Sequence, residues 1–426
     1  MSVGLQETVS AAPGAADARG GAWERWRARL WPLEGGRGSI PALDGLRALA
    51  ALSVLVYHAT SVAGAQTVID GHNLTWMYFY TESGVDLFFT LSGFLLFLPY
   101  ARAILDGKPG PRARTFYRRR ALRILPAYYV CLGVVALAET LMGWGPSAGN
   151  IAAHLVLLHD IWPAFNRTIS GPFWTLAVEW QFYLLLPWVA WLIGRVSGGS
   201  ARRLALGPVA VIALAVGVRE GAAQVEAHWA ALPAGWAPGV DWALRILIGS
   251  QGKYLEVFGV GMLCAVAYLV AMERGGLSSR RAWWMGAALL ALALVVYLTF
   301  APLVFARRNE ILAQWYGRLY PADAAMMLGP LTLGLGYGAL LLGILLGPGL
   351  ARSLFAWTPL RFTGLISYSL YLWHETVINA VYPRLPHTAQ PSPLNGVVAL
   401  AVGFGAAIPL AYLSYQLIER PFLRMR

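Results

Sequence analysis

Long apolar runs alternate with short polar segments along the chain. The runs are about twenty residues long, which is the length an α-helix needs to cross a hydrocarbon core of about 30 Å. The pattern predicts an all-α, polytopic membrane protein with about ten transmembrane helices. We expect these helices at about 43–63, 83–101, 121–142, 172–194, 204–218, 253–272, 281–303, 325–346, 366–382 and 395–418.

The composition supports one membrane domain over residues 40–426. Hydrophobic residues make up 58% of the 426 residues and charged residues only 13%, whereas a soluble domain carries about 25% charged residues. Residues 1–39 lack the short apolar core and the cleavage site of a signal peptide. We expect them to form a cytoplasmic tail, either partly disordered or as an interfacial helix carrying Trp23, Trp26 and Leu30.

The basic residues predict the orientation of the chain. The net charge is +12, but most Lys and Arg residues border apolar runs, where they report topology. With the N-terminus inside, 25 of the 33 basic residues fall on the inner side; the outer segment 304–324, with three arginines, is the weakest part of this assignment. The distribution places both termini in the cytoplasm, argues against nucleic-acid binding and predicts a multi-pass protein of the cytoplasmic (inner) membrane.

Arg47 and His58 stand on the first predicted span. Eleven residues advance a helix by about three turns, so both side chains share one face and lie about 16 Å apart. Ionisable groups inside a membrane are costly and are typical of functional sites. A neutral imidazole can take a proton from a hydroxyl that attacks a thioester. A histidine bonded to a backbone carbonyl, or a proton relay in a transporter, would fit the same pattern.

Glu179 is the second candidate catalytic residue. Counted along the fourth span, it reaches a depth similar to that of His58. A carboxylate at that level could orient the imidazole and stabilise its protonated form. A structural glutamate paired with an arginine is the alternative.

Arg120 and Arg123 are candidates for binding a phosphate-containing ligand. They are three residues apart where the third span begins, and so can point together into the helix bundle. Two guanidinium groups suit a phosphate or pyrophosphate, which they can bind bidentately.

Other polar residues are candidates for supporting roles, although hydrogen bonds between helices would explain them as well. These residues are Asp44, Asp86, Ser367, Tyr371 and His374. His154 and His159 have only Asp160 beside them as a further metal-ligand type. We therefore predict no metal site.

Six separated motifs resemble the acyltransferase 3 family of integral membrane acyltransferases, from about residue 40 to the C-terminus. They are Leu43-Asp44-Gly45-Leu46-Arg47-Ala48 with His58, Gly84-Val85-Asp86-Leu87-Phe88-Phe89 with Leu91-Ser92-Gly93-Phe94, Arg120 and Arg123 before Ile124 and Pro126, Trp174 to Glu179 with Phe182-Tyr183 and Pro187, Ser367 to His374, and Ile418-Glu419-Arg420-Pro421-Phe422. The chain departs from the family pattern at Glu375, where Trp-Pro often follows the histidine.

The resemblance implies transfer of an acyl group, usually acetyl, from acetyl-CoA or another acyl-CoA to a hydroxyl of a sugar-containing acceptor such as a polysaccharide, a glycolipid or a small glycosylated metabolite. It implies no permanently bound cofactor. It also implies that the residues matching Arg47, His58, Arg120 and Arg123 are functional and that Glu179 is an acidic motif residue.

The sequence leaves several readings open. His58 could act as a general base or could carry the acyl group itself. A proton-coupled transporter or exporter could use His58, Glu179 and the arginines as a relay or an anion site. A scaffold for an envelope assembly would need no chemistry from these residues. The sequence does not indicate an oligomeric state.

Overall fold

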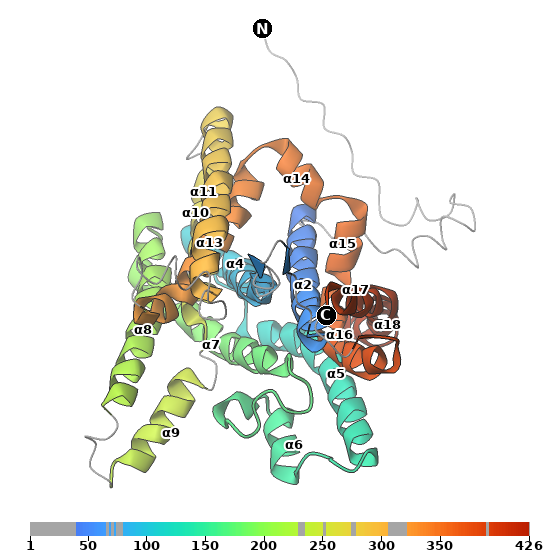
Figure 1. Cartoon of the computed structure of the whole chain (residues 1–426). Coiled ribbons are helices and arrows are strands. Elements are labelled where there is room, and N and C mark those ends of the chain that lie inside the picture. Colours follow the sequence, from blue (N-terminus) through green and yellow to red (C-terminus); the bar gives the residue numbers. More distant parts are fainter. Residues whose placement is uncertain are drawn as a thin grey trace.

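The computed structural model describes residues 40–64, 68–69, 72–73, 80–228, 235–249, 253–273, 278–305, 322–388 and 392–425. The predicted N-terminal tail, residues 1–39, lies outside this part. The main helices are α2 (Pro41–Val62), α4 (Gly84–Leu105), α5 (Ala113–Leu141), α6 (Ala148–Leu155), α7 (Phe173–Ser197), α8 (Ala201–Ala227), α9 (Ala237–Ile248), α10 (Leu255–Tyr268), α11 (Ser279–Phe305), α13 (Ala322–Leu346), α14 (Gly349–Phe355), α15 (Thr358–Leu365), α16 (Ser367–Val381), α17 (Pro393–Val402), α18 (Ile408–Ser414) and α19 (Arg420–Leu423) (Figure 1).

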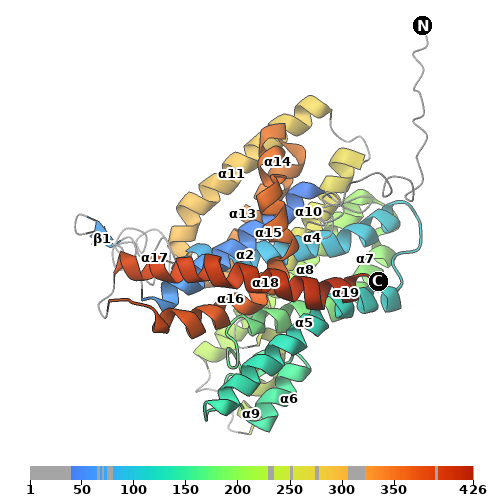
Figure 2. The ribbon, with the colours of Figure 1, turned by 90° about the vertical axis from the view of Figure 1, so that its right-hand side faces the viewer.

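Short elements complete the described chain. A two-stranded antiparallel pair joins β1 (Val68–Ile69) to β2 (His72–Asn73). The segments η1 (Tyr80–Ser83) and η2 (His159–Ile161) are 3₁₀ helices. The segments η7 (Gly403–Ala407) and η8 (Tyr415–Glu419) are π-helices. The segments η7 and η8 connect α17, α18 and α19, which follow one another as one long rod along α16 (Figure 2).

The polytopic helical architecture is confirmed. Among the described residues, nine helical stretches are long and apolar enough to cross a membrane. The remaining predicted span, 366–382, coincides with α16, whose 15 residues are fewer than the roughly 20 that a straight spanning helix needs. The third span is longer than predicted, because α5 begins at Ala113. Arg120 and Arg123 therefore lie within the helix rather than at its start.

The helix α2 lies at the centre of the half of the bundle that holds the candidate residues. It packs against α4, α15, α16 and α17, and Leu46, Ala50 and Leu55 on it are completely buried. Arg47 and His58 on the same helix are half-buried, which makes an internal site possible.

Small residues let α4 and α10 pack closely. A Cβ atom at Gly93 would lie 2.1 Å from the carbonyl oxygen of Phe258, and one at Gly261 would lie 2.1 Å from that of Thr90. Only glycine allows the two backbones to approach so closely, as in other membrane helix pairs. This contact fixes α4, which carries Ser92 and Val85 of the site.

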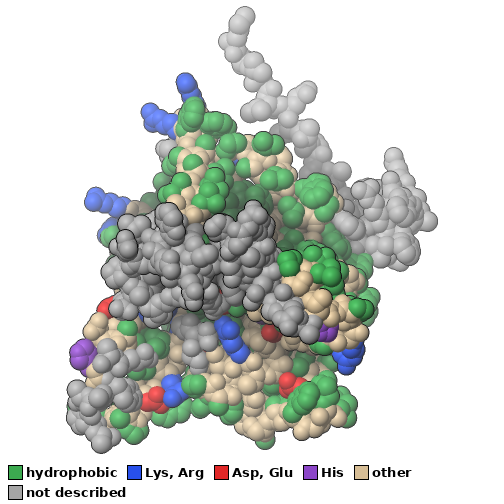
Figure 3. Space-filling model, in the orientation of Figure 1, with side chains coloured by type: hydrophobic (Ala, Val, Ile, Leu, Met, Phe, Trp, Pro, Cys, Tyr) green, Lys and Arg blue, Asp and Glu red, His purple; other side chains and the backbone are tan. Residues whose placement is uncertain are grey.

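The outward faces of several helices are apolar and exposed. Leu137, Trp188 and Leu298 are 59%, 69% and 62% exposed, respectively, and hydrophobic side chains cover much of the face seen in Figure 3. Exposed apolar surface of this extent is unfavourable in water and suits contact with lipid.

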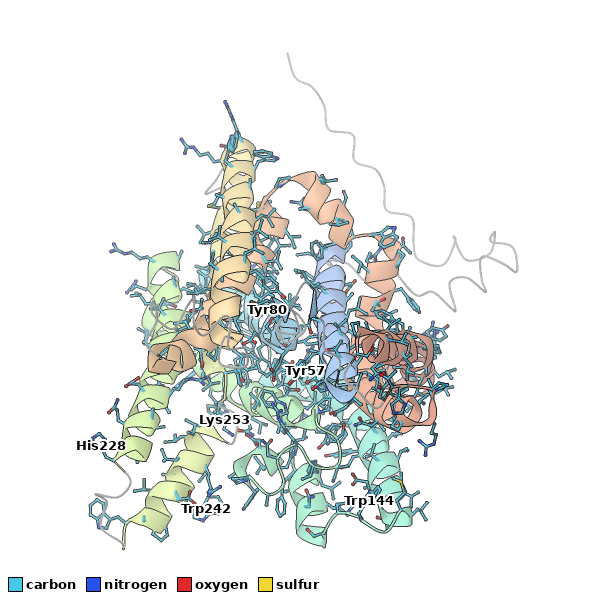
Figure 4. All side chains as sticks on the ribbon, viewed as in Figure 1. Tyr57, Tyr80, Trp144, His228, Trp242 and Lys253 are labelled. Carbon is cyan, nitrogen blue, oxygen red and sulfur yellow. The ribbon has the colours of Figure 1, made fainter. Side chains whose placement is uncertain are left out.

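A closed polar network joins the segment between α5 and α7 to the start of α10. Lys253 Nζ donates to Asp160 Oδ2 at 2.5 Å and to Gln181 Oε1 at 2.7 Å, while Gln181 Nε2 donates to Asp160 Oδ1 at 2.8 Å. Figure 4 shows Lys253 between α7 and α9. Asp160 is only 1% exposed, so its carboxylate depends on these partners.

We expect Lys253→Met to destabilise the protein by about 3 to 5 kcal/mol, because it leaves the buried Asp160 carboxylate without its counter-charge. The thermal unfolding midpoint of the detergent-solubilised protein measures this loss. Lys108→Met is the matched control, since Lys108 is 74% exposed and lies 3.7 Å from Asp106, and surface pairs contribute about 0 to 1 kcal/mol. Equal midpoints for the two variants would contradict the assignment.

Two histidines stack in the same region, outside the spanning helices. The rings of His154 and His159 lie 3.8 Å apart with an interplanar angle of 3°, and neither side chain is exposed. Burial, with the neighbouring His154 ring as a smaller cause, lowers the pKa of His159 to about 3, and burial also lowers the pKa of His154. The folded protein therefore favours the neutral form of both rings.

This stack predicts a loss of stability in acid. Because the unfolded-state pKa of histidine is about 6.5, the contribution of His159 is fully present above that pH and falls by about 2 kcal/mol between pH 6.5 and pH 5. His159→Phe keeps an aromatic ring but cannot titrate, so its unfolding midpoint should fall less than that of the wild type between pH 7 and pH 5. Parallel curves for the two proteins would refute the prediction.

Candidate active site

Two hollows open between the helices that carry the candidate residues. The first, here called the arginine pocket, has a volume of about 80 Å³ and is lined by Arg47, Arg120, Arg123 and Glu179 among others. The second, here called the histidine cavity, has a volume of about 1330 Å³ and contains His58. Arg47 and His58, which were predicted on one face of α2, therefore line two different hollows.

The arginine pocket gathers three guanidinium groups from two helices. Arg47 comes from α2, whereas Arg120 and Arg123 come from α5. Arg47 Nη1 lies 3.5 Å from Asp44 Oδ1. Within the described part of the chain, the buried Nε of Arg120 has no hydrogen-bond acceptor. The pocket thus combines an excess of positive charge with an unused donor, which suits an anionic ligand.

Glu179 faces this arginine pocket. Its Oε1 accepts hydrogen bonds from Ser92 Oγ and Tyr183 Oη, each at 2.5 Å. The predicted contact with His58 is not among the contacts of either residue, because the two side chains line different hollows. A similar depth in the membrane did not bring them together, since depth says nothing about the direction in which each helix face points.

His58 instead contacts two consecutive residues of α16. Its Nδ1 lies 3.2 Å from Nε2 of His374 and 3.7 Å from Oε1 of Glu375. His58 and Glu375 are 17% and 21% exposed, respectively, so both reach the histidine cavity while remaining largely enclosed.

Tyr371 and Val85 line both hollows. The Tyr371 hydroxyl shares a hydrogen bond of 2.7 Å with Thr175 Oγ1, and its ring lies edge-on to Phe88, with centroids 5.6 Å apart. The wall between the arginine pocket and the histidine cavity is therefore built of side chains from α4, α7 and α16.

The remaining predicted residues have different surroundings. Ser367 lines the arginine pocket. Asp86 is 6% exposed and lines neither hollow. In the part of the chain that the structure describes, no group of three His, Cys, Asp or Glu side chains is placed to hold a metal ion.

Sequence reasoning missed several residues of the site. Tyr183 stands four residues after Glu179, a spacing that places both on one helix face and could have identified it. Ser92 lies within a recognised motif but shows its role only through its contact across helices. Glu375 was noted only as a departure from a pattern. Arg167, from the segment between α6 and α7, and Trp174, from the first turn of α7, also line the histidine cavity.

A model of the acyltransferase domain matches residues 40–416. The chain belongs to the acyltransferase 3 family. The match covers the whole set of helices that form both hollows, and the apolar helices of the structure make this member of the family a multi-pass membrane protein.

Two relatives of this acyltransferase 3 member are longer than the chain. It is 26% identical over 401 residues to the peptidoglycan O-acetyltransferase OatA of Listeria monocytogenes, covering 90% of this chain and 55% of the relative. It is 30% identical over 408 residues to the putative peptidoglycan O-acetyltransferase YrhL of Bacillus subtilis, covering 90% and 54%. The chain thus spans about half the length of these relatives.

A third relative matches a shorter stretch. Nodulation protein 10 of Rhizobium leguminosarum is 30% identical over 165 residues, which is 34% of this chain and 42% of that protein. No solved structure matches the chain. The family assignment therefore rests on the domain model and on the sequence relatives.

Proposed function

We propose that this protein is a membrane O-acyltransferase that moves an acyl group, acetyl in the first instance, from acyl-CoA to a hydroxyl of a carbohydrate-containing acceptor. The main support for the proposal is a pair of neighbouring hollows, one rich in guanidinium groups and one containing a histidine. The side chains of Tyr371 and Val85 line both hollows. Family membership and relatives named O-acetyltransferases support the reaction class.

The donor would bind in the arginine pocket. The 3′-phosphate of CoA is nearly dianionic and each phosphate of its pyrophosphate carries one negative charge, and guanidinium groups bind such oxygens bidentately. With the proposed topology, the basic start of α5 faces the cytoplasm, where acyl-CoA is found. The pantetheine arm would then carry the thioester towards the wall that separates the arginine pocket from His58.

Acyl transfer at His58 can follow a general-base route or a route through an acyl-histidine. In the first, His58 takes the proton of the acceptor hydroxyl as its oxygen attacks the thioester carbon, the C–S bond breaks, and the CoA thiolate recovers that proton. In the second, a ring nitrogen of His58 attacks the thioester carbon, the C–S bond breaks and CoA leaves as the thiolate. The acceptor oxygen then takes the acyl group from the ring nitrogen, and the proton of the acceptor hydroxyl passes to the CoA thiolate. The same imidazole serves both routes.

The histidine cavity would receive the acceptor. It combines aromatic walls from Tyr57 and Trp174 with polar groups from Thr376 and Asn379. Its volume of about 1330 Å³ exceeds the roughly 300 to 1,000 Å³ of ordinary small-ligand pockets. A cavity of this size suits several sugar residues, in keeping with relatives named for peptidoglycan.

We expect His58→Ala to reduce acyl transfer by at least about a hundredfold, the contribution typical of a general base, while the protein still folds and inserts. The measurement is transfer of labelled acetyl from acetyl-CoA to soluble peptidoglycan fragments by the purified protein in detergent. His228→Ala is the matched control, because His228 is an exposed residue near the end of α8. Normal turnover by His58→Ala, or proton-coupled uptake without acyl transfer by the wild type, would overturn the proposal.

Replacement of the arginines should weaken donor binding. Arg120→Ala and Arg123→Ala should each raise the KM for acetyl-CoA by about tenfold or more, because each removes charge-assisted hydrogen bonds to phosphate that are worth about 1.5 to 3 kcal/mol. Arg119→Ala, an exposed arginine on the same helix, should leave KM unchanged. If all three variants have the same KM, the arginine pocket does not bind the donor.

A further inference from the structure

The hydrogen bonds of His374 define its tautomer. Its Nδ1 lies 2.9 Å from the backbone oxygen of Tyr371 and 3.1 Å from that of Leu370. A carbonyl oxygen can only accept a hydrogen bond, so Nδ1 of His374 must carry the proton. In the neutral ring, Nε2 is then an acceptor with a free lone pair.

The tautomer of His374 determines that of His58. Nε2 of His374 lies 3.2 Å from Nδ1 of His58, and because the first nitrogen is an acceptor, the second must be the donor. His58 therefore has its proton on Nδ1 and a free lone pair on Nε2. That nitrogen is the one left to meet a substrate in the histidine cavity.

Glu375 stands beside the same nitrogen of His58 without forming a hydrogen bond. The separation of 3.7 Å from His58 Nδ1 exceeds the usual hydrogen-bond range but allows a strong interaction between charges in a poorly hydrated site. The carboxylate rests against the backbone of Gly171, where a Cβ atom would lie only 2.5 Å from Oε2 and 2.7 Å from Oε1. A glycine at 171 thus makes room for the carboxylate in its present place.

We propose that Glu375 is a positioning residue that stabilises the charged form of His58 during acyl transfer, with His374 fixing the tautomer that makes His58 Nε2 the reactive nitrogen. The inference rests on the proposed function and deepens it. When the acceptor hydroxyl gives its proton to Nε2, His58 becomes an imidazolium whose Nδ1–H is still donated to His374. The positive charge then lies 3.7 Å from the Glu375 carboxylate, and it disappears when the CoA thiolate takes the proton.

Glu375 has no competing role in the arginine pocket, whereas Glu179 does. Both hydrogen bonds of Glu179 run to Ser92 and Tyr183 in the arginine pocket, so that carboxylate cannot also stand beside the imidazole. Arg167 lines the histidine cavity as well, and its Nη2 lies 3.8 Å from Glu82 Oε1. Arg167 thus pairs with Glu82 while its charge also acts on Glu375, and Glu375 is the carboxylate that lies beside His58.

Two variants that act in different ways test this inference. Glu375→Gln keeps the shape of the side chain and removes its charge. Gly171→Ala keeps the charge and displaces the carboxylate, at a residue whose backbone is not in the left-handed region. The matched controls are Glu220→Gln on α8, where Glu220 accepts a hydrogen bond from Gln224, and Gly217→Ala on the same helix, where a Cβ atom would meet nothing within 4 Å.

The assay is acetyl transfer from labelled acetyl-CoA to soluble peptidoglycan fragments by the full chain in detergent. We expect kcat to fall by about ten- to a hundredfold in Glu375→Gln and in Gly171→Ala, as for loss of an interaction with a charged group. The KM for acetyl-CoA should stay within about twofold, because the arginine pocket is untouched. A general structural defect would instead affect both constants.

The outcomes separate this inference from the proposed function. If the wild type transfers no acetyl, or His58→Ala transfers it normally, the proposed function fails. If the wild type is active and His58→Ala is not, but Glu375→Gln and Gly171→Ala keep the wild-type kcat or change only KM, the role of Glu375 alone is overturned. Should Glu375→Gln not fold, Gly171→Ala gives the answer by itself.

Discussion

The need to give every ionisable group inside the membrane a partner governs the arrangement of this protein. An unpaired charge in hydrocarbon is costly, and the helix α2 carries both Arg47 and His58. Arg47 is met by Asp44 one turn away, and His58 is met by His374 and Glu375 from another helix. Among the helices α4, α15, α16 and α17 that enclose α2, α16 supplies both partners of His58.

The same need separates the two halves of the proposed reaction. Arginines from α2 and α5 share one pocket with Glu179, whereas His58 lies in the other hollow with Glu375. If the two hollows were one, Glu375 and Glu179 would both lie near the guanidinium groups, and the imidazole would lose its nearby carboxylate to stronger cations. The side chains of Tyr371 and Val85, which line both hollows, stand between the two groups of charges.

Local periodicity predicted one part of the site. Three-residue spacing placed Arg120 and Arg123 together, and both line one pocket with Arg47. The eleven-residue spacing placed Arg47 and His58 on one face of α2, but they line two different hollows. Contacts between helices could not be predicted in this way. Counting along the predicted spans gave Glu179 and His58 a similar depth, but α7 is rotated so that Glu179 faces Ser92. A single sequence does not predict the rotation of a helix that is apolar on most sides.

The short helix α16 shows why the departure at Glu375 matters. A helix of 15 residues begins at Ser367 in the arginine pocket, presents Tyr371 to the wall and reaches His374 and Glu375 one turn later. Each further turn advances about 5.4 Å, so one rigid element sets the distance from the donor pocket to the base. Since Glu375 follows His374 directly, one helix holds both partners of His58. Helix α16 therefore sets both the tautomer of His58 and the position of the Glu375 carboxylate, so that both are in place before the substrate binds.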